Sequence, residues 1–321
     1  MQYKLKSYEE GGLWIIKEHK SLVESLMKSD SFKETLLKIQ DKYQIYDNSL
    51  RFLSYGGQGI LYVGLSVKFH DYVTIKIPFY NPYEYDLSKE LALLKEAKLL
   101  ECFNNTHTPY VPLLFGYEPT GKYLIKKYYN YHTLEWVLQN TSYDVNRISY
   151  ALLAQFCWIN KFFINSNKMM ILSDWKPQNI LFDRANFFPI LIDFGNMKEK
   201  KDVIPDIKLS ISKIGSGHFV HWPPELLIGE PDTCDESCNS FILGSLLFRV
   251  LTGSMPYMNK HHCSSKNTLL QKYKDDYCMA NDLMYTTIKS GTVEARLGEY
   301  VIELINPSFS ERRNIYDFTF L

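Results

Sequence analysis

Residues 171–195 constrain the fold of this chain more than any other segment, and they read ILSDWKPQNILFDRANFFPILIDFG. Two short apolar runs, 180–182 and 190–192, flank a polar turn, and this pattern predicts a tight β-hairpin. A hairpin holds the ends of its two strands side by side. Asn179, just before the first strand, and Asp193, just after the second, are therefore expected to lie close together.

The polar residues of this segment suit phosphoryl transfer. Asn179 and Asp193 offer hard oxygen ligands, and Mg²⁺ is commonly held by one or two such groups together with substrate phosphates. Asp174 lies five residues before Asn179, near enough to receive a proton from an incoming hydroxyl group, and Lys176 could neutralise charge on the transferred phosphoryl group. In such a reaction positioning and charge stabilisation carry most of the catalysis.

The order of these motifs resembles a known family. Asp-Trp-Lys-Pro-Gln-Asn at 174–179, a hairpin and Asp-Phe-Gly at 193–195 are similar to the catalytic loop and metal-binding motif of the eukaryotic-type protein kinase superfamily. Asp-Phe-Gly alone would be weak, since three residues recur by chance in turns. The resemblance covers about residues 50–321. It implies an α+β, bilobal, kinase-like fold with a small β-rich N-lobe (about 49–127) and a larger, mainly helical C-lobe (about 128–321).

Composition sets outer bounds on the function. The 321 residues are 45% hydrophobic and 15% aromatic, which fits a well-packed globular protein. Lys+Arg and Asp+Glu are both 36, so no global field attracts nucleic acid or an anionic membrane. No apolar run approaches the roughly 20 residues of a membrane span, and the N-terminus lacks the apolar core of a signal peptide. We therefore expect a cytoplasmic protein, although an effector secreted into a host cell would show the same features.

The six cysteines include no C-x-x-C pair, which favours free buried thiols. An alternative is a zinc site assembled from Cys234, Cys238, His261, His262 and Cys263.

Residues 1–48 carry no catalytic signal and are expected to form a helical N-terminal extension. Ser31 and Glu34 match a capping box, and apolar residues then recur at helical spacing, so a helix is predicted to start at Ser31. An earlier helix is expected at about 13–27. The extension would dock on the following domain or, as an alternative, bind a regulator.

Residues 53–77 read as strands around a glycine cluster. Gly56, Gly57 and Gly59 allow a backbone to approach an anion closely, although such a cluster taken alone is usually a hairpin turn. In the following strand, alternation places Thr74 and Lys76 on one face and the apolar residues 73, 75 and 77 on the other. A lysine inside an apolar strand needs partners, and we expect a carboxylate on one side and phosphate oxygens on the other.

The resemblance identifies these features as a kinase glycine-rich loop and its strand lysine. Ser54 stands where the first glycine is expected, and Leu61 takes the place of the usual valine over the nucleotide base. Among the acidic residues of the helix at 87–103, Glu96 is the preferred partner of Lys76, with Glu90 as the alternative. The resemblance implies that ATP binding involves Ser54, Gly56, Gly57, Gly59, Leu61, Thr74, Lys76, Glu96, Lys127 and Tyr129.

Several positions depart from the family's pattern. Lys126 would stand at a hinge-adjacent position that usually holds an apolar residue, and Lys127 where an acidic one is common. Leu172 and Ser173 replace the usual His-Arg before the catalytic aspartate, so no arginine is present there to gather a phosphorylated activation loop. Activity independent of activation-loop phosphorylation is therefore expected.

The C-terminal half continues the resemblance. Residues 148–165 predict the core helix of the large lobe, and 196–221 match an activation segment in length. Glu225 in 222–227 stands in the position of the A-P-E glutamate and is expected to form an ion pair with Arg312. Asn239 replaces an aspartate that usually tethers the catalytic loop.

Together these features predict a serine/threonine protein kinase that uses ATP and Mg²⁺ to phosphorylate a protein whose identity the motifs do not specify. Asp174 and Lys176 would be catalytic, Asn179 and Asp193 would hold the metal, and Lys76 would steady the α- and β-phosphates. Two alternatives remain: a small-molecule phosphotransferase of related fold, and a pseudokinase that acts as a scaffold without turnover.

Overall fold

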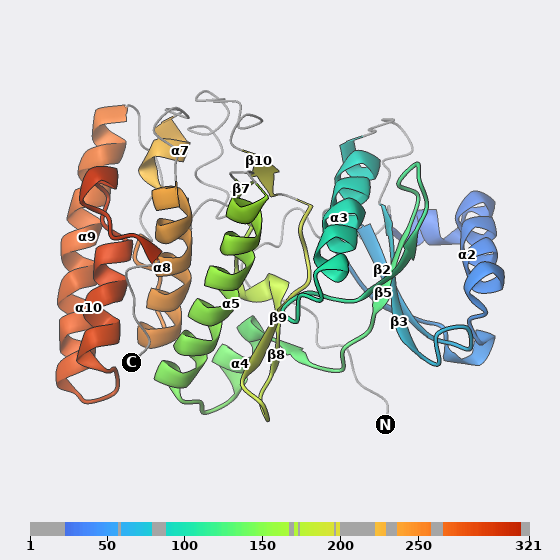
Figure 1. Ribbon diagram of the computed structural model, residues 1–321, viewed down its shortest axis with the longest axis horizontal. Helices are drawn as coiled ribbons and strands as arrows, with labels where there is room; N and C mark the ends of the chain where they lie inside the picture. Colours follow the sequence, from blue (N-terminus) through green and yellow to red (C-terminus); the bar gives the residue numbers. More distant parts are fainter. Residues whose placement is uncertain are drawn as a thin grey trace. The chain divides into compact units, whose positions relative to one another are not determined.

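The computed structural model describes residues 23–56, 59–78, 88–166, 170–172, 174–195, 197–199, 222–228, 236–257 and 266–315. The chain divides into two compact units (Figure 1). Unit 1 comprises Met1–Thr108 and Pro112–Tyr129, and unit 2 comprises Pro109–Val111 and Asn130–Leu321. The β-rich first unit and the mainly helical second unit confirm the predicted α+β class.

Unit 1 is built on a five-stranded antiparallel sheet with the strand order β1-β2-β3-β5-β4. Its strands are β1 (Arg51–Gly56), β2 (Gly59–Ser66), β3 (Asp71–Pro78), β4 (Leu114–Tyr117) and β5 (Leu124–Lys127). Helices α2 (Asp30–Tyr43) and α3 (Ser88–Asn105) lie on opposite faces of this sheet, and a short 3-10 turn, η1 (Asp47–Ser49), leads into β1 (Figure 1).

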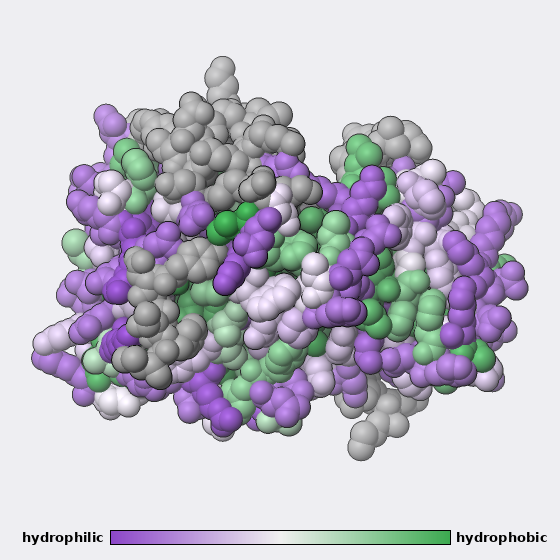
Figure 2. Space-filling model, viewed as in Figure 1, coloured by the Kyte–Doolittle hydropathy of each residue, from purple (hydrophilic) through white to green (hydrophobic). Residues whose placement is uncertain are grey.

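Alternation along β3 explains how both faces of the sheet are covered. Val73, Ile75 and Ile77 are buried in one apolar cluster with Phe32 and Ile39 of α2. The intervening residues of β3 face α3 instead, as the period-two pattern predicted. Hydrophilic side chains cover the outer surface of α2 (Figure 2), so this helix is amphipathic and its apolar side packs on the sheet.

The start of α2 corrects one prediction. The helix begins at Asp30, and its N-cap is Ser29, whose side chain accepts a hydrogen bond from the backbone N–H of Phe32 at 3.3 Å. The predicted capping box at Ser31 and Glu34 is therefore wrong by two residues. Ser29 has extended backbone geometry and also donates to the carbonyl of Leu26, so it links α2 to the helical residues 23–28. The rest of the expected earlier helix lies outside the described residues.

Unit 2 is organised around a helix that is buried along nearly its whole length, α8 (Glu236–Thr252). Figure 1 shows α5 (Val145–Asn165), α10 (Ala295–Leu304) and α9 (Lys266–Lys289) running alongside it. Gly244 permits the close approach of α8 and α10, because a Cβ atom there would lie 2.7 Å from the Cβ of Leu304. The predicted core helix at 148–165 is the main part of α5, whose N-cap Asp144 accepts from two backbone N–H groups.

The remaining elements of unit 2 are short. They are α4 (Leu134–Asn140), α7 (Pro224–Ile228), β6 (His132–Thr133), β7 (Met170–Ile171), β8 (Ile180–Asp183), β9 (Phe188–Leu191), β10 (Lys198–Glu199), η2 (Pro177–Asn179) and η6 (Phe309–Glu311). β6, β8 and β9 form one small sheet, and β7 and β10 form another. No helix within the described residues is both long enough and apolar enough to cross a membrane.

Candidate active site

The predicted hairpin is present in unit 2. β8 and β9 pair in antiparallel register from Ile180 opposite Leu191 to Asp183 opposite Phe188. The second strand begins two residues earlier and ends one residue earlier than predicted. The backbone N–H of Ile192 donates to the carbonyl of Asn179 at 2.9 Å, so the pairing continues past the strand ends. Asn179 and the residue before Asp193 are thereby brought side by side.

Three of the predicted residues meet in one polar cluster. The side-chain amide of Asn179 donates to Oδ2 of Asp174 at 2.8 Å and to the carbonyl of Asp174 at 3.1 Å. Lys176 Nζ lies 2.6 Å from Oδ1 of Asp174. Both oxygens of the Asp174 carboxylate therefore have a donor, and the carboxylate is held in one orientation. The Asp174 side chain is 13% exposed and that of Lys176 is 31% exposed, so the cluster opens to solvent on the lysine side.

Asp193 stands at the end of the hairpin, where its Oδ1 accepts a hydrogen bond from the N–H of Gly195 at 3.1 Å. Asn179 directs its Nδ2 at Asp174, which leaves its side-chain oxygen, Oδ1, as the atom that can bind a metal. A carboxylate and an amide oxygen are a donor set that Mg²⁺ uses together with phosphate oxygens. The residues present thus fit the metal that the sequence predicts.

The loop that carries Asp174 is anchored to α8 through Asn239. Its Oδ1 accepts from the backbone N–H of Leu172 at 3.0 Å, and its Nδ2 donates to the carbonyl of Met170 at 2.7 Å and to Oδ1 of Asn160 at 3.0 Å. An amide accepts and donates at the same time, whereas an aspartate in its ionised form only accepts. Asn239 therefore tethers the loop despite the replacement of the usual acidic residue.

Apolar residues of the same loop fix it from the inside. Leu172 and Trp175 are fully buried, and the centre of the Trp175 ring lies 4.5 Å from the centre of the Phe156 ring of α5. Ser173, between Leu172 and Asp174, lies outside the described residues. Burial of Trp175 and Leu172 leaves the polar groups of Asp174 and Lys176 on the more exposed side of the loop.

A second anchor was not predicted from the sequence. Gln178 donates to Oε2 of Glu135 in α4 at 3.2 Å, and Oε1 of the same glutamate pairs with Arg249 of α8 at 2.6 Å. Glu135 is buried, and its two contacts together link the loop to α4 and α8. Sequence reasoning gave no signal for it, because Glu135 and Arg249 are 114 positions apart and neither belongs to a recognisable motif.

In unit 1, Lys76 of β3 forms an ion pair with Glu96 of α3. Lys76 Nζ lies 2.7 Å from Glu96 Oε2, and the side chains are 7% and 0% exposed. This pairing of Lys76 with Glu96 is the one predicted from the sequence in preference to a pairing with Glu90. The other oxygen of Glu96 lies 2.8 Å from Nζ of Lys126 in β5, which is buried to the same degree. That contact was missed, although the alternation of β5 could have indicated it once β5 was known to pair with β3.

A family model described as Protein kinase domain matches residues 48–314 of this chain. The chain belongs to the protein kinase family. Among its curated relatives, Serine/threonine-protein kinase PknB of Mycolicibacterium smegmatis is 22% identical over 233 residues, which are 68% of this chain and 34% of that protein. Serine/threonine-protein kinase D of Synechocystis is 25% identical over 228 residues, 68% of this chain and 42% of that protein.

A shorter match, to Ribosomal protein S6 kinase alpha-6 of Danio rerio, is 32% identical over 105 residues, or 33% of this chain and 13% of that protein. The chain thus matches less than half of the length of each of these relatives.

The structure also describes most of the predicted glycine-rich segment. Ser54 pairs with Leu61 and Gly56 with Gly59 across the β1–β2 hairpin, with a bulge between Phe52 and Ser54. Gly59 is required by packing, because a Cβ atom there would lie 2.5 Å from the carbonyl oxygen of Ile77. Gly57 lies outside the described residues, and the role of this loop in binding ATP stays a prediction.

The remaining predicted nucleotide contacts are on β3, β5 and the residues after β5. Thr74 is buried and pairs with Lys126 in the sheet. Lys127 Nζ lies 2.9 Å from Oδ2 of Asp71, and it also lies 5.8 Å from the ring centre of Tyr129. Burial raises the pKa of the Tyr129 hydroxyl. Lys127 is thus engaged at the start of β3, and contacts of Lys127 and Tyr129 with a nucleotide stay predictions.

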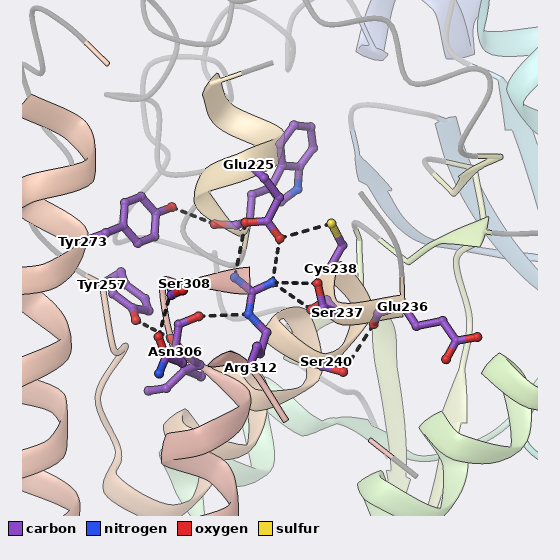
Figure 3. A network of polar contacts seen from close by, with 12 residues as sticks. Glu225, Glu236, Ser237, Cys238, Ser240, Tyr257, Tyr273, Asn306, Ser308 and Arg312 are labelled. Carbon is purple, nitrogen blue, oxygen red and sulfur yellow. Dashed lines mark hydrogen bonds and ion pairs between the residues drawn. The ribbon is translucent and has the colours of Figure 1, made fainter. Parts of the chain in front are cut away.

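The predicted ion pair of the kinase A-P-E glutamate is confirmed (Figure 3). Arg312 meets Glu225 through two parallel contacts, Nη1 to Oε1 at 2.6 Å and Nη2 to Oε2 at 3.2 Å. Arg312 also donates to the backbone carbonyls of Ser237 and Asn306, and Cys238 donates to Glu225. This buried network joins α7, the start of α8 and the C-terminal end of the described chain.

Of the predicted activation segment, only 197–199 are described. β10 pairs antiparallel with β7, Lys198 opposite Ile171 and Glu199 opposite Met170.

The cysteine prediction needs a correction. The described cysteines are free thiols, but Cys102 and Cys278 are exposed rather than buried, since both lie on outward-facing helix positions. Of the five residues considered for a zinc site, Cys234, His261, His262 and Cys263 lie outside the described residues.

Proposed function

We propose that this chain is a serine/threonine protein kinase that transfers the γ-phosphate of ATP to a protein hydroxyl group in a Mg²⁺-dependent reaction. The observation that carries the proposal is the cluster of Asp174, Lys176 and Asn179 at the end of a hairpin that leads into Asp193. A lysine two residues after the catalytic aspartate is the usual serine/threonine arrangement. Two of the relatives bear serine/threonine-protein kinase in their names.

Asp174 and Lys176 carry the chemistry of transfer. The substrate hydroxyl oxygen attacks the γ-phosphorus, the bond from that phosphorus to the β–γ bridging oxygen breaks, and the hydroxyl proton passes to Asp174. The two donors on the Asp174 carboxylate, 2.6 Å and 2.8 Å away, orient it for this task. Lys176 is exposed enough to reach the transferred group, where its charge stabilises the transition state.

Asn179 and Asp193 would hold Mg²⁺, which supplies charge neutralisation at the phosphates when it is bound. Their common position at one end of the hairpin supports this assignment. In unit 1, Lys76 binds the α- and β-phosphates, and the buried contact with Glu96 keeps its ammonium group in place.

Independence from activation-loop phosphorylation is part of the proposal. At the position of the usual arginine the chain has Ser173, which has no charge with which to bind a phosphate. The loop is held instead by Asn239 and by the burial of Leu172 and Trp175. These contacts need no modified residue.

Transfer of labelled γ-phosphate from ATP tests the proposal. Purified protein is incubated with Mg²⁺ and a generic basic protein, beside Asp193→Asn, which keeps the size of the side chain but removes its charge. Asp282→Asn, an exposed aspartate on α9, serves as the matched control. We expect Asp193→Asn to lose at least about 100-fold in kcat and the control to match the wild type.

Equal rates in wild type and Asp193→Asn would contradict the assignment of the metal ligand. A wild type that binds ATP but modifies no protein, while it phosphorylates a small alcohol or amine, would favour the small-molecule phosphotransferase. Binding without any transfer would favour the scaffold.

A further inference from the structure

Glu96 of α3 carries an ion pair on each of its two carboxylate oxygens. Lys76 of β3 lies 2.7 Å from Oε2 and Lys126 of β5 lies 2.8 Å from Oε1. The Glu96 side chain is fully buried and each lysine side chain is 7% exposed. Both contacts are therefore shielded from water. In such a buried environment a charged hydrogen bond is stronger than at the surface.

The sheet itself sets the positions of the two lysines. In the antiparallel pairing of β3 and β5, Lys76 stands opposite Leu124 and Thr74 stands opposite Lys126. Side chains two positions apart on a strand share a face, so Lys76 and Lys126 are diagonal neighbours on the face that α3 covers. Glu96 reaches both of them from α3, so one carboxylate joins two strands and a helix.

A buried carboxylate with one cation at one oxygen retains freedom to rotate and to offer either oxygen. A second cation at the other oxygen removes that freedom. We propose that Lys126 is a positioning residue for Lys76: by holding Oε1 of Glu96, it keeps Oε2 directed at the lysine that binds phosphate. The inference rests on the proposed function, in which Lys76 binds ATP. Lys126 acts through Glu96 rather than by touching the nucleotide.

A double-mutant cycle tests whether Lys126 acts through Glu96. Lys126→Met keeps the length of the side chain and removes its charged donor, and Glu96→Gln removes the charge that both lysines share. In the wild-type background Lys126→Met is expected to lower kcat/KM for ATP by roughly 10- to 100-fold, mainly through a higher KM. In the Glu96→Gln background the same change is expected to cost less than about threefold, because the residue through which Lys126 acts is already altered.

Two further variants serve as controls. Lys122→Met removes an exposed lysine in the turn before β5 and is expected to leave kcat/KM unchanged. Lys126→Arg keeps a charged donor and is expected to retain kcat/KM within about tenfold of the wild type. A purely structural role would lower the thermal unfolding temperature of Lys126→Met without a selective change in KM. If Lys126→Met does not fold, Lys126→Gln, which keeps a neutral donor, takes its place in the cycle.

An equal loss in both backgrounds would overturn the inference, because Lys126 would then act independently of Glu96. Wild-type values for Lys126→Met would overturn it as well. Neither result would affect the proposed function, which is tested on the wild-type chain and fails if that chain transfers no phosphate from ATP to a protein. The inference fails as well if the wild-type chain does not bind ATP.

Discussion

Asn239 departs from the aspartate that is usual in the family, and its amide makes contacts that tether the loop. Its amide holds the N–H of Leu172 and the carbonyl of Met170 at once, and Asn160 supplies a third partner. An aspartate there would keep the first contact but would face the carbonyl of Met170 with a second acceptor. Asparagine at 239 is therefore matched to asparagine at 160, and the loop is tethered without a buried charge.

Asn239→Ala is expected to destabilise the protein by about 1–3 kcal/mol, because a buried N–H and a buried carbonyl lose their partners. Asn239→Asp is expected to be harmful as well, since its carboxylate cannot donate to Met170 or Asn160. Urea unfolding and kcat measure both effects, with Asn140→Ala, an exposed asparagine on α4, as the control. If Asn239→Asp equals or exceeds the wild type in stability, the amide is not the reason for the tether.

Residue patterns predicted the contacts that lie within motifs. The pairs Lys76–Glu96 and Glu225–Arg312 followed from the family's motifs, and the hairpin followed from two apolar runs around a turn. Lys126 was noticed as unusual, but its contact with Glu96 depends on which strand lies beside β3, and local sequence does not encode the order of strands.

At the scale of elements, α2 is as much a part of the first unit as the strands are. Its residues Phe32, Ile39 and Tyr43 are buried with the apolar face of the sheet, and Gly116 leaves room for the Tyr43 ring. The helix itself was predictable from its periodicity. Its first residue was not, because Ser29 and Ser31 are both good caps and the choice depends on the preceding helical residues 23–28.

Ile39→Ala is expected to lower the free energy of unfolding by about 2–5 kcal/mol, since this fully buried side chain would leave a cavity. Leu37→Ala, two residues earlier in α2 and 62% exposed, is expected to change it by less than about 0.5 kcal/mol. Denaturant unfolding compares the two variants. Equal effects would mean that α2 does not pack on the sheet as described.

The hairpin turn of β8 and β9 offers a test by pH. Asp183 accepts from the side chain of Asn186 and from the N–H groups of Ala185 and Asn186, and these hydrogen bonds hold the pKa of its carboxyl below the ordinary value. Because the pKa is lower in the folded state, the contribution to stability is fully present above the unfolded pKa, about 4. It is lost as the pH falls through the folded value.

Asp183→Ala is therefore expected to destabilise the protein by about 1 kcal/mol at pH 7. The difference from the wild type should shrink when unfolding is measured at pH 3. A difference that stays constant, or grows, between pH 7 and pH 3 would contradict the role of the ionised carboxylate.

At the scale of the whole molecule, the chain combines the kinase fold with contacts of its own that hold the residues predicted to react. Unit 1 fixes Glu96 between two lysines, and unit 2 fixes the loop of Asp174 through Asn239 and Glu135. The α+β class was predictable, because motifs occur in order from residue 54 to residue 312. The anchors were not, because they join residues that are far apart in the sequence.

We propose that Asp174 directs transfer of phosphate from ATP to a protein hydroxyl group. The most direct measurement is mass spectrometric location of the phosphate after incubation of a generic basic protein, and of the chain itself, with ATP and Mg²⁺. Wild type is compared with Asp174→Asn, which keeps the shape of the side chain but not its basicity. We expect phosphoserine or phosphothreonine with the wild type and at least about a 100-fold lower yield of phosphorylated residues with the variant. Equal phosphorylation by both proteins would rule out this role of Asp174.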